Sequence, residues 1–171
     1  MRRRREARER AVQFLFQNDL NPPENLQAAL DQFWDSQRLN ALLETQTGPT
    51  YGHSPELPPA TVDDLAMRMF ADTLVRGVLE RRDQLDEIIR KHALNWDLHR
   101  MAVVDRNVMR LGIYEMLFRD DIPPVVSINE AVDIAKRFST EESGRFVNGI
   151  LDRVKAELQR PARTARDGSA V

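Results

Sequence analysis

The segment from Asp105 to Val154 constrains the fold most, because its apolar residues recur with the period of a helix and its breaks are explicit. Between residues 128 and 138 the apolar side chains fall every three or four positions, as on one face of a helix. Pro123 and Pro124 precede this stretch and cannot continue a helix from upstream. The pattern predicts two amphipathic helices in close succession, after a separate central helix.

Two pairs of residues in this segment have the spacing of a capping box. Ser127 stands three positions before Glu130, and Ser139 stands three positions before Glu142. In such a box the hydroxyl oxygen accepts from the third helical N–H, while the carboxylate accepts from the N–H of the capping residue. We therefore expect the two helices to begin at Ser127 and Ser139.

The same residues resemble a known family. The segment V-S-I-N-E-A-V-D-I-A-K-R-F (126–138), followed by E-E-S-G-R-F-V-N-G-I-L-D (141–152), is similar to the NusB family of bacterial transcription antitermination factors. The similarity extends over residues 105–116 and over the arginine-rich start that runs into residues 11–16. It covers about half of the chain, at both ends and in the family's order. The resemblance implies an all-α bundle made of two packed three-helix halves.

Length and composition agree with such a bundle. A chain of 171 residues with 42% hydrophobic residues can fill one core, so we expect a single all-α domain of about seven helices over residues 1–160. Cysteine is absent, no apolar run reaches the length of a membrane span, and the basic start lacks the apolar stretch of a signal peptide. These observations predict no membrane association and a cytoplasmic location.

The upstream part of the chain divides at proline and glycine clusters. The expected helices run from about Ala7 to Leu20, Glu24 to Glu44, Thr61 to His92 and Val103 to Arg119. Thr61 and Asp64 form a further capping pair, and a polar patch at residues 80–83 predicts a break in the long helix. Residues 45–60 read as a mobile loop and residues 161–171 as a disordered tail. Trp34 and Trp96 are both predicted to lie in the core.

The positive charge is concentrated at the two ends of the chain. Residues 1–10 contain six Arg and two Glu, and residues 160–171 contain three Arg and one Asp, within a chain whose net charge is −2. A basic arm on an acidic body is typical of proteins that bind a polyanion. Nucleic acid is therefore the expected partner.

The N-terminal arginines allow two interpretations. They could be a solvated terminus, frayed until about Ala7, or they could contact phosphates and stack on unpaired bases. The resemblance favours the second, because NusB-like proteins bind RNA through an arginine-rich start. It implies RNA contacts by Arg3, Arg4, Arg5 and Arg8, with Glu6 weakening the basic run.

A second group of candidate RNA-binding residues lies near the C-terminal helices. Phe146, flanked by Arg145 and close to Lys136, could stack on a base, or it could pack between helices. Phe16 and Asp105 match positions that the family uses to bind NusE, the small-subunit ribosomal protein that also acts in elongation. Packing and helix capping are equally simple explanations for these two residues.

The sequence contains no arrangement typical of catalysis. His53, His92 and His99 lack zinc-ligand spacing, and there is no glycine-rich phosphate loop or nucleophile motif. Acidic pairs stand at helix ends, where turn chemistry and the helix dipole account for them. We therefore expect no enzyme activity, no metal and no cofactor.

These features favour an RNA-binding antitermination factor. The resemblance implies that it binds the single-stranded boxA element in the leader of ribosomal RNA operons, jointly with NusE and within the elongation complex. An alternative is a helical protein-interaction adaptor whose basic arm has no RNA role, and a homodimer is possible. Helix-turn-helix DNA binding is disfavoured, since the basic residues gather at the termini rather than on a recognition helix.

Overall fold

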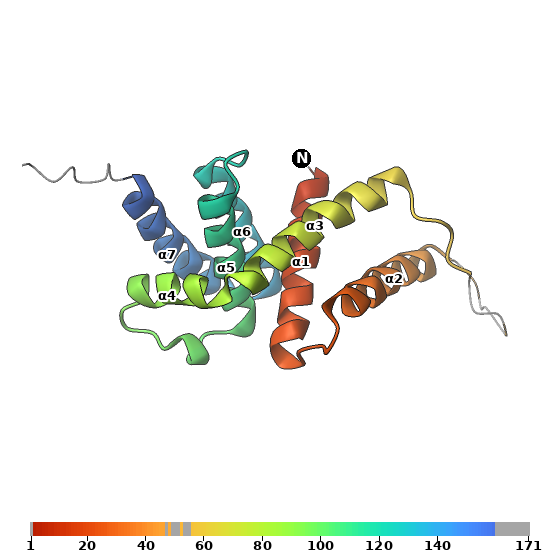
Figure 1. Ribbon diagram of the computed structural model, residues 1–171, viewed down its shortest axis with the longest axis horizontal. Helices are drawn as coiled ribbons and strands as arrows, with labels where there is room; N and C mark the ends of the chain where they lie inside the picture. Colours follow the sequence, from red (N-terminus) through yellow and green to blue (C-terminus); the bar gives the residue numbers. More distant parts are fainter. Residues whose placement is uncertain (1, 47, 49–51, 53–55, 160–171) are drawn as a thin grey trace, which may run out of the picture. The chain divides into compact units, whose positions relative to one another are not determined.

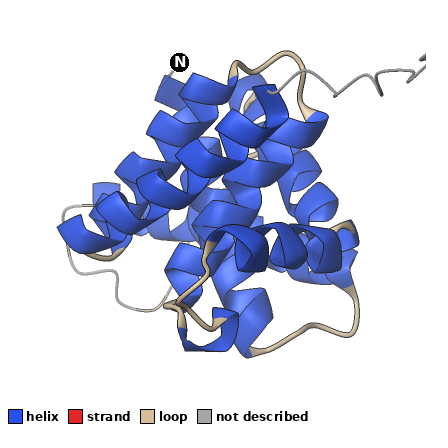
Figure 2. Ribbon diagram, turned by 90° about the vertical axis from the view of Figure 1, so that its left-hand side faces the viewer, coloured by secondary structure: helices blue, strands red, loops and turns tan. Residues whose placement is uncertain are grey.

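The computed structural model describes residues 2–46, 48, 52 and 56–159, and these residues form helices and loops without a strand (Figures 1 and 2). The prediction of an all-α fold with seven helices is confirmed. A short 3-10 helix, η1, lies between the fourth and fifth. The helices are α1 (Arg2–Leu20), α2 (Leu26–Thr45), α3 (Val62–Glu80), α4 (Arg82–His92), η1 (Leu98–Arg100), α5 (Val103–Phe118), α6 (Pro124–Phe138) and α7 (Glu141–Gln159).

Contacts along the chain divide it into two compact units. The first, residues 1–81, holds α1 to α3, and the second, residues 82–171, holds α4 to α7 with η1. The boundary falls at Arg81 and Arg82, so the predicted break at residues 80–83 is confirmed. That residues 1–160 act as one domain stays a prediction. The expected 161–171 tail and part of the 45–60 loop, residues 47, 49–51 and 53–55, lie outside the described residues.

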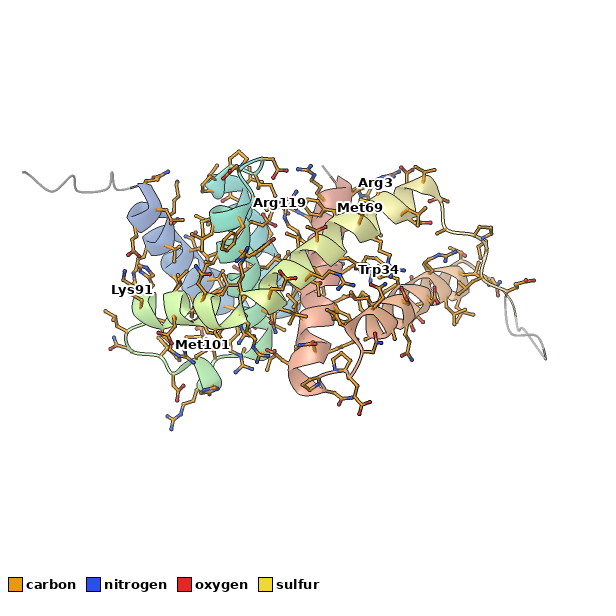
Figure 3. The ribbon with its side chains drawn as sticks, viewed as in Figure 1. Arg3, Trp34, Met69, Lys91, Met101 and Arg119 are labelled. Carbon is orange, nitrogen blue, oxygen red and sulfur yellow. The ribbon has the colours of Figure 1, made fainter. Side chains whose placement is uncertain are left out.

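The core of the first unit forms where α1 packs along α3. Phe33 of α2 joins it through an edge-on contact with Phe14, at 5.5 Å between ring centroids. Trp34 is 5% exposed, and its Nε1–H donates to Asp72 Oδ1 at 2.8 Å (Figure 3). The predicted core position of Trp34 is confirmed. The small and aliphatic residues buried on α1 are Ala7, Ala11, Val12 and Leu15.

One expectation for this unit is wrong. The first helix begins at Arg2 and not near Ala7, because Arg, Ala and Glu favour helix and an ion pair from Arg3 to Asp63 links the first turn to α3. Two apolar residues of this unit, Leu20 and Val62, are 63% and 83% exposed. Both stand at the end of a helix, where the packing partner no longer covers the apolar face.

The second unit is built around α5, which packs against α4, α6 and α7. Every residue from 107 to 115 is buried, so this helix is enclosed on all sides. An added Cβ at Gly112 would lie 3.2 Å from Leu151 Cδ1, and the glycine thereby lets α7 approach closely. The central helix predicted from Val103 onward is confirmed.

Buried polar pairs accompany this apolar core. Asp86 and Arg110 form a two-bond ion pair, with distances of 2.6 Å and 3.1 Å from the guanidinium nitrogens to the carboxylate oxygens. The Ser127 hydroxyl donates to Glu115 Oε2 at 2.8 Å, and both residues are at most 2% exposed. Such pairs satisfy polar groups that would otherwise lack partners in the core.

The two predicted capping boxes in this unit are wrong, whereas the Thr61–Asp64 box is confirmed. Helix α6 begins at Pro124, whose fixed φ suits the first helical position, and no side chain caps it. Ser127 therefore lies inside the helix, facing Glu115. For α7 the capping hydroxyl belongs to Thr140, whose Oγ1 accepts from the Ser143 N–H at 3.1 Å.

Two apolar residues at the ends of helices in this unit are partly exposed. Phe138 ends α6 and is 36% exposed, and Leu158 in the last turn of α7 is 44% exposed. Lys136 and Arg137, in the last turn of α6, are exposed.

Candidate nucleic-acid interface

Arg3, Arg4 and Arg5 lie exposed on the first turns of α1. Arg3 forms an ion pair with Asp63 at the start of α3 (Figure 3), and hydrogen bonding to that carboxylate raises the pKa of Arg3. The Arg4 guanidinium lies 5.0 Å from the centre of the Phe70 ring. The three cations are thus held on a helix and remain accessible to a ligand.

Arg8 occupies a different environment. It is 3% exposed, and its guanidinium lies over the Phe70 ring at 5.4 Å. The structure corrects its expected place in an exposed arm, because the i, i+4 spacing from Arg4 brings it onto the face that packs against α3. A phosphate contact by Arg8 would require this side chain to leave the packed face.

In the second unit, Lys136 lies against Gly144, and Arg145 follows this glycine in the chain. A Cβ at Gly144 would come within 2.6 Å of Lys136 Cγ, so the lysine stem lies directly over the α7 backbone. The Lys136 ammonium is 3.9 Å from Glu141 Oε2, and Arg145 is exposed. The ends of α6 and α7 therefore present both cations to solvent.

Phe146 is half-buried, which is compatible both with stacking on RNA and with packing alone. Its ring contacts Trp96 edge-on, with 5.4 Å between centroids and 64° between the ring planes. Trp96 is 59% exposed, so its expected core position is wrong. The short segment between α4 and η1 that carries Trp96 is too near the surface to enclose the indole.

Two hollows adjoin this aromatic pair, with Trp96 and Phe146 lining both. One, of about 430 Å³, lies between α7 and residues 91–96. The other, of about 260 Å³, includes Arg100, Asp105 and Ser143. Sequence reasoning missed the contribution of Trp96, since its partner is fifty positions away and no local pattern links the two.

Asp105 lies at the third position of α5 and is 7% exposed. Its Oδ2 accepts from the Ser143 hydroxyl at 3.0 Å, whereas Oδ1 has no hydrogen-bond partner among the described residues. Burial raises the pKa of this carboxyl, and the Ser143 bond lowers it by less. Phe16, the other candidate for partner binding, is half-buried on α1. The two residues belong to different units.

Further expectations concern metal binding, membrane-spanning helices and residues that lie outside the described ranges. The described ranges contain no group of three or more His, Cys, Asp or Glu side chains that could hold a metal ion. None of the described helices is long and apolar enough to cross a membrane. His53 and the C-terminal arginines Arg160, Arg163 and Arg166 lie outside the described residues.

Comparison with known proteins agrees with these features. The model of the NusB family matches residues 5–156. The transcription antitermination protein NusB of Bacillus licheniformis is 40% identical over 160 residues, which cover 92% of this chain and 99% of the relative.

Solved structures show the same fold. NusB of T. maritima superposes with a TM-score of 0.68 at 36% identity, over 90% of this chain and 91% of that one. A chain from a structure of the antitermination factors NusB and NusE in complex with dsRNA gives a TM-score of 0.68 at 25% identity, over 92% of this chain and 98% of that one. The chain belongs to the NusB family of transcription antitermination proteins.

Proposed function

We propose that this protein is an RNA-binding transcription antitermination factor that acts together with NusE. Its RNA is a boxA-type single strand in the leader of ribosomal RNA operons, bound within the elongation complex. The observation that carries the proposal is the exposed row Arg3, Arg4 and Arg5 on an ordered helix, in a chain that belongs to the NusB family. The similarity to a chain from the structure of NusB and NusE in complex with dsRNA supports the choice of partners.

The basic side chains have the role of phosphate contacts. Arg3 to Arg5, Lys136 and Arg145 each offer a charged group to solvent, and phosphate contacts make affinity depend on salt. Such contacts carry no sequence information. Selectivity must come from base contacts, for which Phe146 is a candidate, and from a second protein beside the RNA. Cooperative binding with NusE follows from this division of roles.

Phe16 and Asp105 are our candidates for NusE contacts. The half-buried ring of Phe16 offers apolar area at an interface, whereas the Asp105 carboxyl is buried and its assignment rests on the family resemblance. We would measure NusE affinity for a Phe16→Ala, Asp105→Asn double variant. Unchanged affinity would remove both residues from the interface.

The test of the RNA role is a titration into labelled boxA-type RNA and a scrambled RNA, at two salt concentrations, with and without NusE. We expect selective binding that tightens with NusE. A variant with Arg3, Arg4 and Arg5 changed to Ala should reduce the slope of log affinity against log salt by about 0.7 for each phosphate that is no longer neutralised.

The matched control removes a cation elsewhere. Arg90 on α4 is exposed and pairs with Glu87 at 2.6 Å, so Arg90→Ala should leave the slope unchanged. Equal binding of both RNAs with no effect of NusE would reduce the arginines to a nonspecific charge. Capture of NusE without any RNA binding would favour the adaptor alternative.

A further inference from the structure

The hollow between α7 and residues 91–96 contains an aromatic side chain that the unit's own packing does not explain. Trp96 keeps 59% of its surface exposed, although it touches Phe146 edge-on. Because the indole is exposed, the protein lacks the stabilisation that burial of a large aromatic ring would contribute. An exposed tryptophan beside a second ring is instead a common platform for a planar ligand.

Gly149 keeps this hollow open. It lies inside α7, and a Cβ added there would meet no atom within 4 Å. An alanine would therefore fit and would favour the helix by about 1 kcal/mol. Neither backbone conformation nor packing within the described residues requires glycine at this position. The consequence of glycine is free space beside Trp96 and Phe146, in a hollow of about 430 Å³.

Cationic groups surround the hollow. Arg145 is exposed beside Phe146, and Arg153 Nη1 donates to the His92 carbonyl at 2.8 Å. Lys91 forms an ion pair with Glu157, whose other oxygen lies 2.6 Å from His92 Nε2 (Figure 3). The described residues that line the hollow include three cations, Lys91, Arg145 and Arg153, and no acidic residue, so its rim has a positive balance.

We propose that this hollow accepts an unpaired nucleobase of the bound RNA, stacked against Trp96 with its flanking phosphates near Arg145 and Arg153. The assignment rests on the proposed function and adds a base-binding subsite to it. Aromatic rings beside guanidinium groups suit single-stranded nucleic acid, because the rings stack on bases while the cations neutralise phosphates. Pockets of this volume are of the size that holds a small planar group.

The test is RNA affinity in the presence of NusE, at fixed salt, for substitutions on two sides of the hollow. Trp96→Ala should weaken binding about 5- to 150-fold, the range for loss of one base–aromatic stack. Gly149→Leu should fill the space and weaken binding similarly, whereas Gly149→Ala, the matched control, should retain most of the affinity. The salt slope should stay unchanged in all three, since no phosphate-binding cation is removed.

Fluorescence gives an independent readout without disturbing the hollow. The chain has two tryptophans, so a Trp34→Phe variant emits from Trp96 alone. BoxA-type RNA should quench this emission, and inorganic polyphosphate, which carries charge but no base, should not. Wild-type thermal stability in Gly149→Leu would separate loss of the subsite from unfolding.

The outcomes separate this proposal from the function it rests on. Wild-type affinity in both Trp96→Ala and Gly149→Leu, with the arginine variant still impaired, would overturn the subsite and leave the RNA role intact. Weaker NusE capture by Trp96→Ala without RNA would assign the hollow to a protein contact and also overturn the subsite. Failure of the wild-type protein to bind RNA would overturn both proposals.

Discussion

Asp64 in the first unit and Asp105 in the second hold the same position, third in a helix, but have opposite environments. Asp64 accepts from the Thr61 N–H at 2.9 Å in an exposed capping box, and that bond lowers the pKa of its carboxyl. Asp105 is buried beneath α7 with Ser143 as its donor, and burial raises the pKa of its carboxyl. The position in the helix alone therefore does not determine whether the pKa of an aspartate is raised or lowered.

The two units also differ in how deeply their ion pairs are buried. The ion pairs of the first unit, such as Arg3 with Asp63 and Arg68 with Asp31, lie where water can replace a missing partner. The second unit also has exposed pairs, such as Arg90 with Glu87, but in addition it buries the pair of Asp86 with Arg110. Removing a buried partner leaves a charge in the core, whereas removing an exposed one costs little. We expect the second unit to depend more strongly on single polar residues.

The largest expected effect is for Asp86→Ala. The substitution leaves the Arg110 guanidinium buried without its carboxylate, and the free energy of unfolding should fall by about 3–5 kcal/mol. Urea unfolding monitored by circular dichroism measures the change. The control is Asp31→Ala, which opens an exposed ion pair and should change stability far less. Equal losses in the two variants would contradict the contrast between the units.

Ser127→Ala should have the next largest effect. It removes the hydroxyl that donates to Glu115 Oε2 in the core, at a cost of about 1–3 kcal/mol for the loss of a buried hydrogen bond. Thermal unfolding of Ser127→Ala beside Ser127→Thr would check this. The threonine variant keeps the hydroxyl and should lose less. If instead Ser127 capped α6, the alanine variant would lower helicity at the start of α6 and leave Glu115 unaffected.

Thr61→Ala should cost about 1 kcal/mol, because it removes the hydroxyl that accepts from the Asp64 N–H at 3.1 Å. The loss should appear as faster amide hydrogen exchange in the first turn of α3. Thr61→Ser, which retains the capping oxygen, is the matched control. A loss as large as that of Asp86→Ala would mean that the first unit depends on this single exposed hydrogen bond.

The smallest expected effect is on pH dependence, through Asp105→Asn. A carboxyl whose folded pKa is raised binds its proton more tightly in the folded state. Its stabilising contribution is therefore present below the ordinary value of 3.8 and is lost as the pH rises through the higher folded value. The melting temperature of Asp105→Asn relative to wild type should rise between pH 3 and pH 7, about the span in which Asp residues titrate.

The capping aspartate of the first unit should behave in the opposite sense. Because the folded pKa of Asp64 is lowered, its contribution is present above the ordinary value and lost as the pH falls through the lower folded value. Asp64→Asn should therefore lose stability relative to wild type as the pH rises from 3 to 7. Parallel pH profiles for the two variants would remove the difference between the two aspartates.

The helices themselves could be predicted because their signals are local. Apolar periodicity located the central helix, prolines marked its end, and the Thr61–Asp64 spacing marked the start of α3. The resemblance of residues 126–152 to the NusB family was sufficient to predict the family of the chain. The match of the NusB family model over residues 5–156 confirms this prediction. The RNA-binding and NusE-binding assignments of individual residues stay predictions.

The environment of polar and aromatic side chains could not be predicted from local spacing. Ser127 has the spacing of a capping residue, but its hydroxyl donates a hydrogen bond to Glu115 on another helix. Arg8 continues a basic run but is buried over Phe70, and Trp96 has the large apolar ring of a core residue but stays exposed. In each case the outcome depends on neighbours that are distant in sequence.

The sequence by itself therefore determined the helical class, most helix boundaries and the family, since periodicity, proline and capping chemistry act within a few residues. Only the tertiary structure decided which charges are buried, which acid keeps its proton more tightly, and that Trp96, Phe146 and Gly149 border one hollow. Burial and pairing of side chains depend on contacts between segments that are distant in sequence, and local sequence patterns do not predict those contacts.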